Sequence, residues 1–163
     1  YTYSSAISAC EKGGQWERAL SLLSEMRSAG VKPNVISYSA AISACEKGGK
    51  WQRALALLGE MRAAGVKPNA YSYSAAIAAC ATNGEWEMSL SLLDEMRVAK
   101  ISPDVYCLDT VIHACKEAGR WEAAGAVEKG REAVEREGQW PNQLSFNAAL
   151  STATRKVDAS LKK

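Results

Sequence analysis

The sequence carries the tetrapeptide Val31-Lys32-Pro33-Asn34, which returns as Val66-Lys67-Pro68-Asn69 and, with changes, as Ile101-Ser102-Pro103-Asp104. Successive copies are 35 residues apart, and the stretches 1–34 and 36–69 differ at only 8 of 34 positions. Cysteine and tryptophan keep the same step, at Cys10, Cys45, Cys80 and Cys115 and at Trp16, Trp51, Trp86 and Trp121. A match this close at a fixed period indicates one supersecondary unit that was duplicated and stacked.

Each unit is predicted to contain two helices. In the second unit Gly48-Gly49 ends the first helix, because glycine readily adopts the left-handed conformation at a helix exit. Gly65 ends the second helix, and Pro68 prevents its continuation. The residues fall into two series with helical spacing, Tyr38, Ala41, Ile42 and Cys45, then Trp51, Ala54, Leu55, Leu58 and either Met61 or Arg62.

Two short helices cannot bury their apolar faces alone, so the sequence predicts an all-α solenoid of stacked helix-turn-helix repeats. We expect repeats at about 1–34, 35–69, 70–104 and 105–142, with a partial repeat at 143–163. The fourth repeat departs from the pattern, because Pro141 follows Pro103 by 38 residues and the methionine of the earlier units is lost. This end of the chain is interpreted as a polar cap of the array or as a docking place.

Composition limits the class of protein. Apolar residues make up 47% of the 163 residues and charged residues 23%, which is typical of a globular chain. The apolar runs are too short to cross a bilayer, so no membrane insertion is expected. A net charge of only +2 does not favour a nucleic-acid partner. The chain opens at Tyr1 without a leader, so we interpret it as the interior of a longer polypeptide.

Signatures of enzymes and metal sites are missing from the sequence. It contains no P-loop, no Gly-x-Gly-x-x-Gly, no nucleophile elbow, no His-Glu-x-x-His and no deaminase His-x-Glu with Cys-x-x-Cys. Zinc ligands are closely spaced, whereas Cys10, Cys45, Cys80 and Cys115 occur once per repeat, so they are predicted to be small buried residues. Cys107 is an extra cysteine that this pattern does not explain. His113 is the only histidine, and no recurring carboxylate is paired with it in the sequence. We therefore expect no enzyme, no metal, no cofactor and no small-molecule substrate.

The unit resembles the pentatricopeptide repeat. The resemblance covers essentially the whole chain and differs from the 34-residue tetratricopeptide repeat. It implies a right-handed superhelix with the first helices on the concave face, binding single-stranded RNA in a mitochondrion or chloroplast, one base per repeat. The residues that carry it, with their copies one repeat away, are Tyr38, Ile42, Cys45, Gly49, Ala54, Leu55, Met61, Gly65, Pro68 and Asn69.

In that family the base is selected by a residue early in the first helix and by the last residue of the repeat. The resemblance implies the pairs Ser4 with Asn34, Ser39 with Asn69, Ser74 with Asp104, and Asp109 with Asn142. A hydroxyl with Asn resembles the adenine pair and a hydroxyl with Asp the guanine pair, which predicts A-A-G. Asn both donates and accepts, whereas ionised Asp only accepts. The Asp109 pair departs from the usual choices.

The resemblance also implies an apolar residue between successive bases, here Tyr1, Ile36, Tyr71 and Tyr106. Each of these residues has a structural alternative. Asn34, Asn69, Asp104 and Asn142 precede helices and are good N-caps, the serines allow close helix approach, and the tyrosines can pack on the neighbouring repeat. The four tryptophans are interpreted as filling joints between helices, and Arg27, Arg62 and Arg97 suit helix C-termini.

Two functions from different classes remain. One is selective binding of single-stranded RNA that supports processing, stability or translation of an organellar transcript. The other is a structural scaffold that docks protein subunits within a large organellar assembly such as a ribosome.

Overall fold

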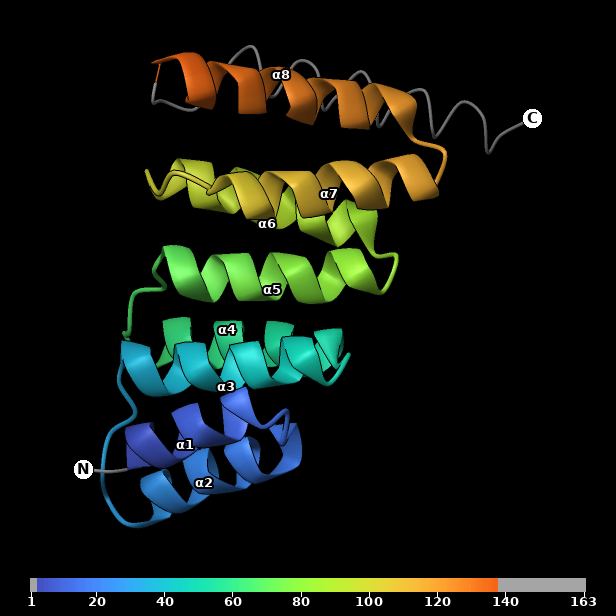
Figure 1. Ribbon diagram of the computed structural model, residues 1–163. Helices are drawn as coiled ribbons and strands as arrows, with labels where there is room; N and C mark the ends of the chain where they lie inside the picture. Colours follow the sequence, from blue (N-terminus) through green and yellow to red (C-terminus); the bar gives the residue numbers. More distant parts are fainter. Residues whose placement is uncertain (1–2, 138–163) are drawn as a thin grey trace.

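The structure is a computed structural model that describes residues 3–137 (Figure 1). Tyr1, Asn142 and the predicted partial repeat 143–163 lie outside the described residues. Within residues 3–137 the regular structure is entirely helical. The helices are α1 (Tyr3–Lys12), α2 (Trp16–Ser28), α3 (Val35–Lys47), α4 (Trp51–Ala63), α5 (Ala70–Thr82), α6 (Trp86–Val98), α7 (Val105–Glu117) and α8 (Trp121–Glu137).

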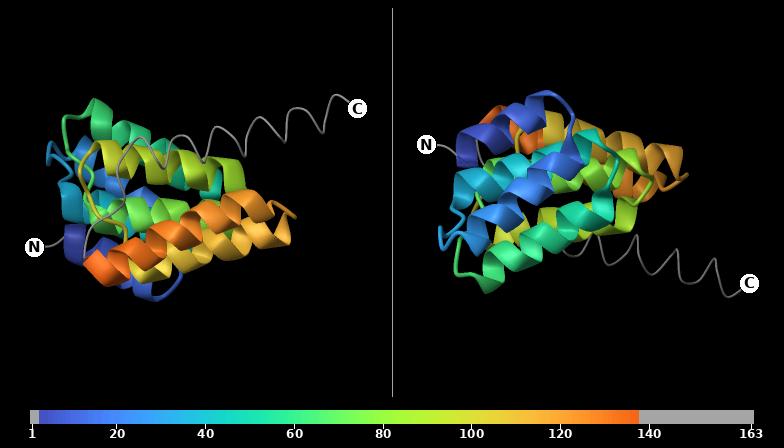
Figure 2. Two further views of the ribbon diagram at one scale, coloured as in Figure 1. Left: turned by 90° about the horizontal axis from the view of Figure 1, so that it is seen from above. Right: turned by 90° about the horizontal axis from the view of Figure 1, so that it is seen from below.

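The helices form antiparallel pairs that stack into an all-α solenoid, as the sequence predicts (Figure 1). The odd-numbered helices pack on one another in one layer. Helices α2, α4 and α6 each pack on their own partner and on the first helix of the next pair. Seen along the stack, successive pairs are rotated relative to one another (Figure 2). The first helices therefore make the continuous spine of the array, and their N-terminal ends lie in a row.

The helices end close to the glycine residues that the sequence analysis identified as helix ends. Helix α3 ends at Lys47, and Gly49 adopts φ 70°. The backbone N–H of Lys50 then donates to the Cys45 carbonyl over 2.8 Å, which closes the exit turn. The second helices end in the same way at Gly30 and Gly65, but Lys100 takes this left-handed position after α6, with φ 61°. Lys100 shows that the turn geometry persists where the glycine is lost.

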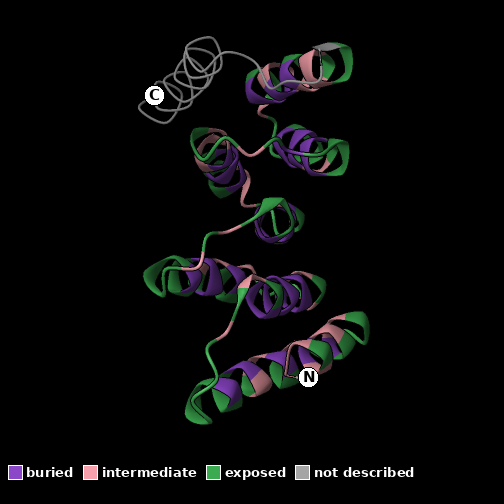
Figure 3. Ribbon diagram, turned by 90° about the vertical axis from the view of Figure 1, so that its left-hand side faces the viewer, coloured by how far each residue is buried: buried purple, intermediate pink, exposed green. Residues whose placement is uncertain are grey.

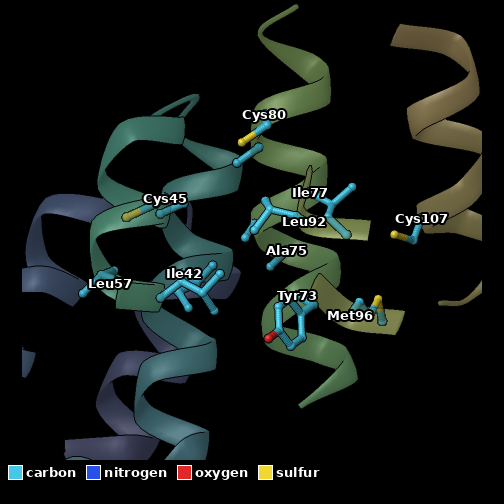
Figure 4. Close-up of a cluster of buried hydrophobic side chains, with 14 of the residues drawn as sticks. Ile42, Cys45, Leu57, Tyr73, Ala75, Ile77, Cys80, Leu92, Met96 and Cys107 are labelled. Carbon is cyan, nitrogen blue, oxygen red and sulfur yellow. The ribbon is translucent and has the colours of Figure 1, made fainter. Parts of the chain in front are cut away.

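The core runs through the whole stack, between the two layers and between successive repeats (Figure 3). Tyr38, Ala41, Ile42 and Cys45 are buried as predicted, and so are the methionines at 26, 61 and 96. Figure 4 shows that the core side chains of neighbouring repeats meet. Burial raises the pKa of the thiols, to about 11 for Cys45 and Cys115 and about 12 for Cys80 and Cys107. These four cysteines are thus protonated core residues at neutral pH.

Polar side chains connect consecutive repeats. The Arg27 guanidinium donates to Tyr38 Oη over 3.1 Å and to Glu60 over 2.8 Å, both in the next repeat. Arg62 repeats this contact one unit later with Tyr73 and Glu95. The predicted helix-terminal position of these arginines is confirmed, and the structure adds their partners in the following repeat. Arg97 pairs with Asp94 in its own helix. Leu108 and Gly130 stand where the tyrosine and the glutamate of the following repeat would be.

The tryptophans open the second helices but do not all fill joints. Trp16 lies against the turn of the next repeat, where a Cβ on Gly48 would be 2.3 Å from Trp16 Cδ1. Lys50 lies over the Trp16 ring at 5.3 Å, and Arg120 over Trp86 at 5.2 Å. The expectation is wrong for Trp121, which is 66% exposed. No helix in residues 3–137 is long and apolar enough to span a membrane, and no group of metal ligands occurs there.

Candidate nucleic-acid interface

The N-termini of α3 and α5 are closed by asparagine caps. Asn34 and Asn69 have extended backbones, and each accepts a hydrogen bond at Oδ1 over 2.9 Å, from the backbone N–H of Ser37 and Ser72. The two serine hydroxyls accept in return from the asparagine N–H groups over 2.8 Å. Such reciprocal caps satisfy helix-end donors that would otherwise lack a partner. The structural role proposed for these asparagines is therefore confirmed.

Helix α7 begins with a related cap. Asp104 Oδ1 accepts from the Cys107 backbone N–H over 2.7 Å. Cys107 stands where Ser37 and Ser72 stand in the earlier repeats, so no hydroxyl returns the hydrogen bond. Cys107, the cysteine that lies outside the 35-residue series, is fully buried beside Ser74. We call Asn34, Asn69 and Asp104 the N-cap row.

Capping fixes which side-chain atom the N-cap row offers to a ligand. Only an oxygen can accept from a backbone N–H, so Oδ1 of Asn69 must face Ser72 and Nδ2 must point elsewhere. Within residues 3–137 no group bonds Asn69 Nδ2 or Asp104 Oδ2. Both residues are exposed. The row therefore presents amide donors at two positions and a carboxylate acceptor at the third.

The first-helix residues predicted to select bases differ in burial and in hydrogen bonding. Ser39 is buried, and its hydroxyl donates to Asn69 Oδ1 over a long 3.4 Å. Ser4 is half-buried on α1, and half-buried Ser74 lies beside Cys107. The structure thus brings Ser39 and Asn69 into direct contact, while no hydrogen bond joins Ser4 to Asn34 or Ser74 to Asp104 within the described chain. Asp109 is exposed on α7.

Large apolar side chains project from the start of the same helices. Ile36 is 58% exposed, Tyr71 48% and Tyr106 62%. Ile36 borders an open depression that also holds Ser4, Ser8 and Lys12 of α1. An apolar residue of one repeat therefore lies next to the predicted selector of the repeat before it. This arrangement suits a base held between a polar edge and an apolar face.

Tyr71 also makes a contact that the sequence did not reveal. Its hydroxyl donates to Glu11 Oε1 over 2.6 Å, and Ser43 donates to the same oxygen over 2.9 Å. Lys47 lies 3.5 Å from it. Partial burial raises the pKa of Glu11, but the hydrogen bonds from Tyr71 and Ser43 and the charge of Lys47 outweigh it, so this pKa is lowered overall. Glu11 thus joins α1, α3 and α5, and its role was missed because its partners are distant in sequence.

The fourth repeat is built differently. Asp109 Oδ1 lies 3.0 Å from Arg131 Nε on α8, and Arg131 also lies 3.5 Å from Glu135. Its predicted partner Asn142 lies outside the described residues. The sequence showed that a methionine is lost at the position of Arg131. It did not show that Arg131 contacts Asp109.

Two lysines stand beside the N-cap row. Lys32 and Lys67 are exposed and lie two residues before Asn34 and Asn69. Neither takes part in an ion pair with any residue in the range 3–137. They supply positive charge next to the row despite the low net charge of the chain.

Comparison with protein families and solved structures agrees with this architecture. The profile described as pentatricopeptide repeat domain matches residues 1–48, 21–83 and 91–155, and the profile described as PPR repeat matches 71–101. Because these matches span most of the sequence, the chain belongs to the pentatricopeptide repeat family. Comparison with curated protein sequences gives no match.

Several solved structures share the fold. The pentatricopeptide repeat protein PPR10 from maize aligns with a TM-score of 0.69 and 27% identity over 98% of this chain and 24% of PPR10. PPR10 in complex with an 18-nt psaJ RNA element aligns at 0.67 and 27% identity, covering 96% of this chain and 23% of that protein. The chain therefore spans about a quarter of the length of PPR10.

A more distant structure supports the fold alone. It is the PPR domain of Arabidopsis thaliana protein-only RNase P 1 in complex with tRNA, with a TM-score of 0.70 and 15% identity over 94% of this chain and 79% of that domain.

Proposed function

We propose that this chain binds single-stranded RNA and that the first three repeats each select one base. The selecting pairs are Ser4 with Asn34, Ser39 with Asn69, and Ser74 with Asp104, and the preferred sequence is A-A-G. The protein acts on RNA in a mitochondrion or chloroplast, as the family resemblance implies. It carries out no chemistry of its own in this part of the chain.

The observation that carries the proposal is the N-cap row. Oδ1 of Asn69 and Oδ1 of Asp104 accept the capping hydrogen bonds, whereas Asn69 Nδ2 and Asp104 Oδ2 have no hydrogen-bond partner among the described residues. Both residues are exposed. A donor at this point matches N1 of adenine, which is an acceptor. An acceptor matches N1–H and the amino group of guanine, which are donors. A single Asn-to-Asp change therefore inverts the edge that is recognised.

The surroundings of the row support the same ligand. Ile36 and Tyr106 are exposed at the helix starts and can contact base faces. Lys32 and Lys67 lie beside the row, where phosphates would pass. PPR10, which shares 27% identity with this chain, was crystallised with an 18-nt RNA element.

The small number of repeats limits the free energy of RNA binding by this chain. Stacking and edge contacts contribute about 1–3 kcal/mol per base, and association with ordering of the strand costs several kcal/mol. Three or four repeats are thus expected to bind RNA with a Kd on the order of micromolar.

Selection from a random single-stranded RNA pool tests the proposal. We expect A-A-G to be enriched, with retention that falls as salt rises because phosphates are also contacted. Salt-sensitive retention without any enriched motif would reject base selection and would favour a scaffold that docks protein subunits.

A further inference from the structure

Arg131 occupies a position that belongs to the core in the other repeats. At the 35-residue step it corresponds to Met26, Met61 and Met96, which are 4%, 0% and 0% exposed. Arg131 is half-buried, and its guanidinium reaches the surface of α8. The first three repeats therefore bury a methionine where the fourth places a charge.

A second change accompanies the first. The first-helix selector is serine at positions 4, 39 and 74, but it is Asp109 in the fourth repeat. The two changed residues meet, because Arg131 Nε lies 3.0 Å from Asp109 Oδ1. Arg131 is held from the other side by Glu135 at 3.5 Å. The serine and the methionine at these two positions have thus been replaced by an ion pair that links α7 to α8.

We propose that the Asp109–Arg131 ion pair makes the fourth repeat a position that holds RNA without selecting a base. This inference rests on the proposed function of the first three repeats. A serine hydroxyl is small and can donate or accept, so it adapts to a base edge beside the N-cap residue. The paired carboxylate and guanidinium are larger, and Asp109 Oδ1 is already engaged. Arg131 is thereby a positioning residue that acts through Asp109.

The fourth repeat keeps the means to hold a base. Tyr106 is 62% exposed, and stacking on an aromatic ring tolerates every base. The fourth position is therefore expected to add affinity but no specificity. The longer second helix of this repeat could also abolish base selection at this position. The experiment must therefore separate the effect of the ion pair from the effect of the longer helix.

Equilibrium binding of four RNAs, A-A-G followed by A, C, G or U, tests the inference on the whole chain. For the native chain we expect the four Kd values to agree within about twofold. The double variant Asp109→Ser with Arg131→Met restores the residue types of the earlier repeats. It should discriminate among the four bases by about tenfold. Arg136→Met removes a charge from an exposed site on α8 and should change no preference.

Each result has one meaning. Discrimination at the fourth base by the native chain overturns the inference and leaves the proposed function intact. A double variant that folds, shown by unchanged helical circular dichroism, but stays indifferent at this base also overturns it, because the longer helix is then the cause. Equal binding of A-A-G and U-U-U by the native chain rejects the proposed function itself, and the inference with it.

Discussion

The Ser39 hydroxyl donates to Asn69 Oδ1 over 3.4 Å, joining the first helix of one repeat to the N-cap of the next. The same oxygen accepts the backbone N–H of Ser72, so Asn69 serves helix geometry and side-chain pairing at once. Capping and base selection are therefore compatible uses of one residue, because the amide has two ends. The cap orients the oxygen, and the nitrogen is left for a ligand.

Helix capping and base selection by Asn69 can be separated, because only capping affects the stability of the fold. Asn69→Asp keeps an oxygen at the cap and should leave the free energy of unfolding within about 0.5 kcal/mol of the native value, because Asn and Asp cap equally well. Asn69→Ala should cost about 1 kcal/mol. Ser72→Ala should cost about 1–2 kcal/mol, since it leaves the Asn69 N–H without its partner. Urea unfolding followed by circular dichroism measures all three, and an Asn69→Ala chain as stable as the native one would contradict the cap.

The carboxylates of Glu11 and Glu46 should affect stability in opposite directions. The pKa of Glu11 is lowered in the folded chain, so its contribution is present at neutral pH and is lost as pH falls through that pKa. Glu11→Gln should therefore cost about 1 kcal/mol at pH 7 and progressively less as the pH falls below the usual pKa of a glutamate. The measurement is the urea midpoint as a function of pH.

Glu46 is the matched control for this effect. Burial first, and then repulsion from Glu11, raise the pKa of Glu46 above its usual value despite the nearby Lys47. Its charged form therefore opposes folding at neutral pH, and the opposition disappears as pH falls through the raised pKa. Glu46→Gln should leave the midpoint unchanged or raise it at pH 7. Equal losses from the two substitutions would show that the Glu11 contacts with Ser43 and Tyr71 do not stabilise the stack.

Gly48 should not tolerate a side chain, because the Trp16 ring fills the space that a Cβ would need. A Cβ there would lie 2.3 Å from Trp16 Cδ1, whereas the equivalent Cβ on Gly13 would be 3.5 Å from its nearest neighbour, the Ala9 carbonyl. Gly48→Ala is expected to cost about 1–3 kcal/mol through forced movement of the ring. Gly13→Ala should be neutral or stabilise by about 0.4–1 kcal/mol, because it restricts the unfolded chain. Equal thermal midpoints for the two variants would show that Trp16 moves freely from the turn.

Much of the fold follows from local signals. Periodicity identified the buried faces around Ile42 and Cys45, and glycine and proline identified the helix ends, because these features depend on residues close in sequence. The N-cap role of Asn34 and Asn69 was also predictable, since a cap is a local structure.

Contacts between repeats were not predictable in the same way. Tyr71 meets Glu11 across 60 residues because α1, α3 and α5 lie together, which no pattern within one repeat encodes. Trp16 likewise contacts Gly48 and Lys50, which belong to the turn of the following repeat. Trp121 is exposed although its copies are half-buried, a difference that the 35-residue pattern did not predict. The base preferences stay predictions, since they depend on a ligand.

The most direct test of base selection compares the native chain with Asn69→Asp on two RNAs, A-A-G and A-G-G. The native chain should prefer A-A-G by about tenfold, and the variant should prefer A-G-G by a similar factor, because Oδ2 replaces Nδ2 at an otherwise unchanged cap. Asn83→Asp adds the same charge at the end of α5 and should keep the native preference. An unchanged preference in folded Asn69→Asp would contradict base selection by the N-cap row.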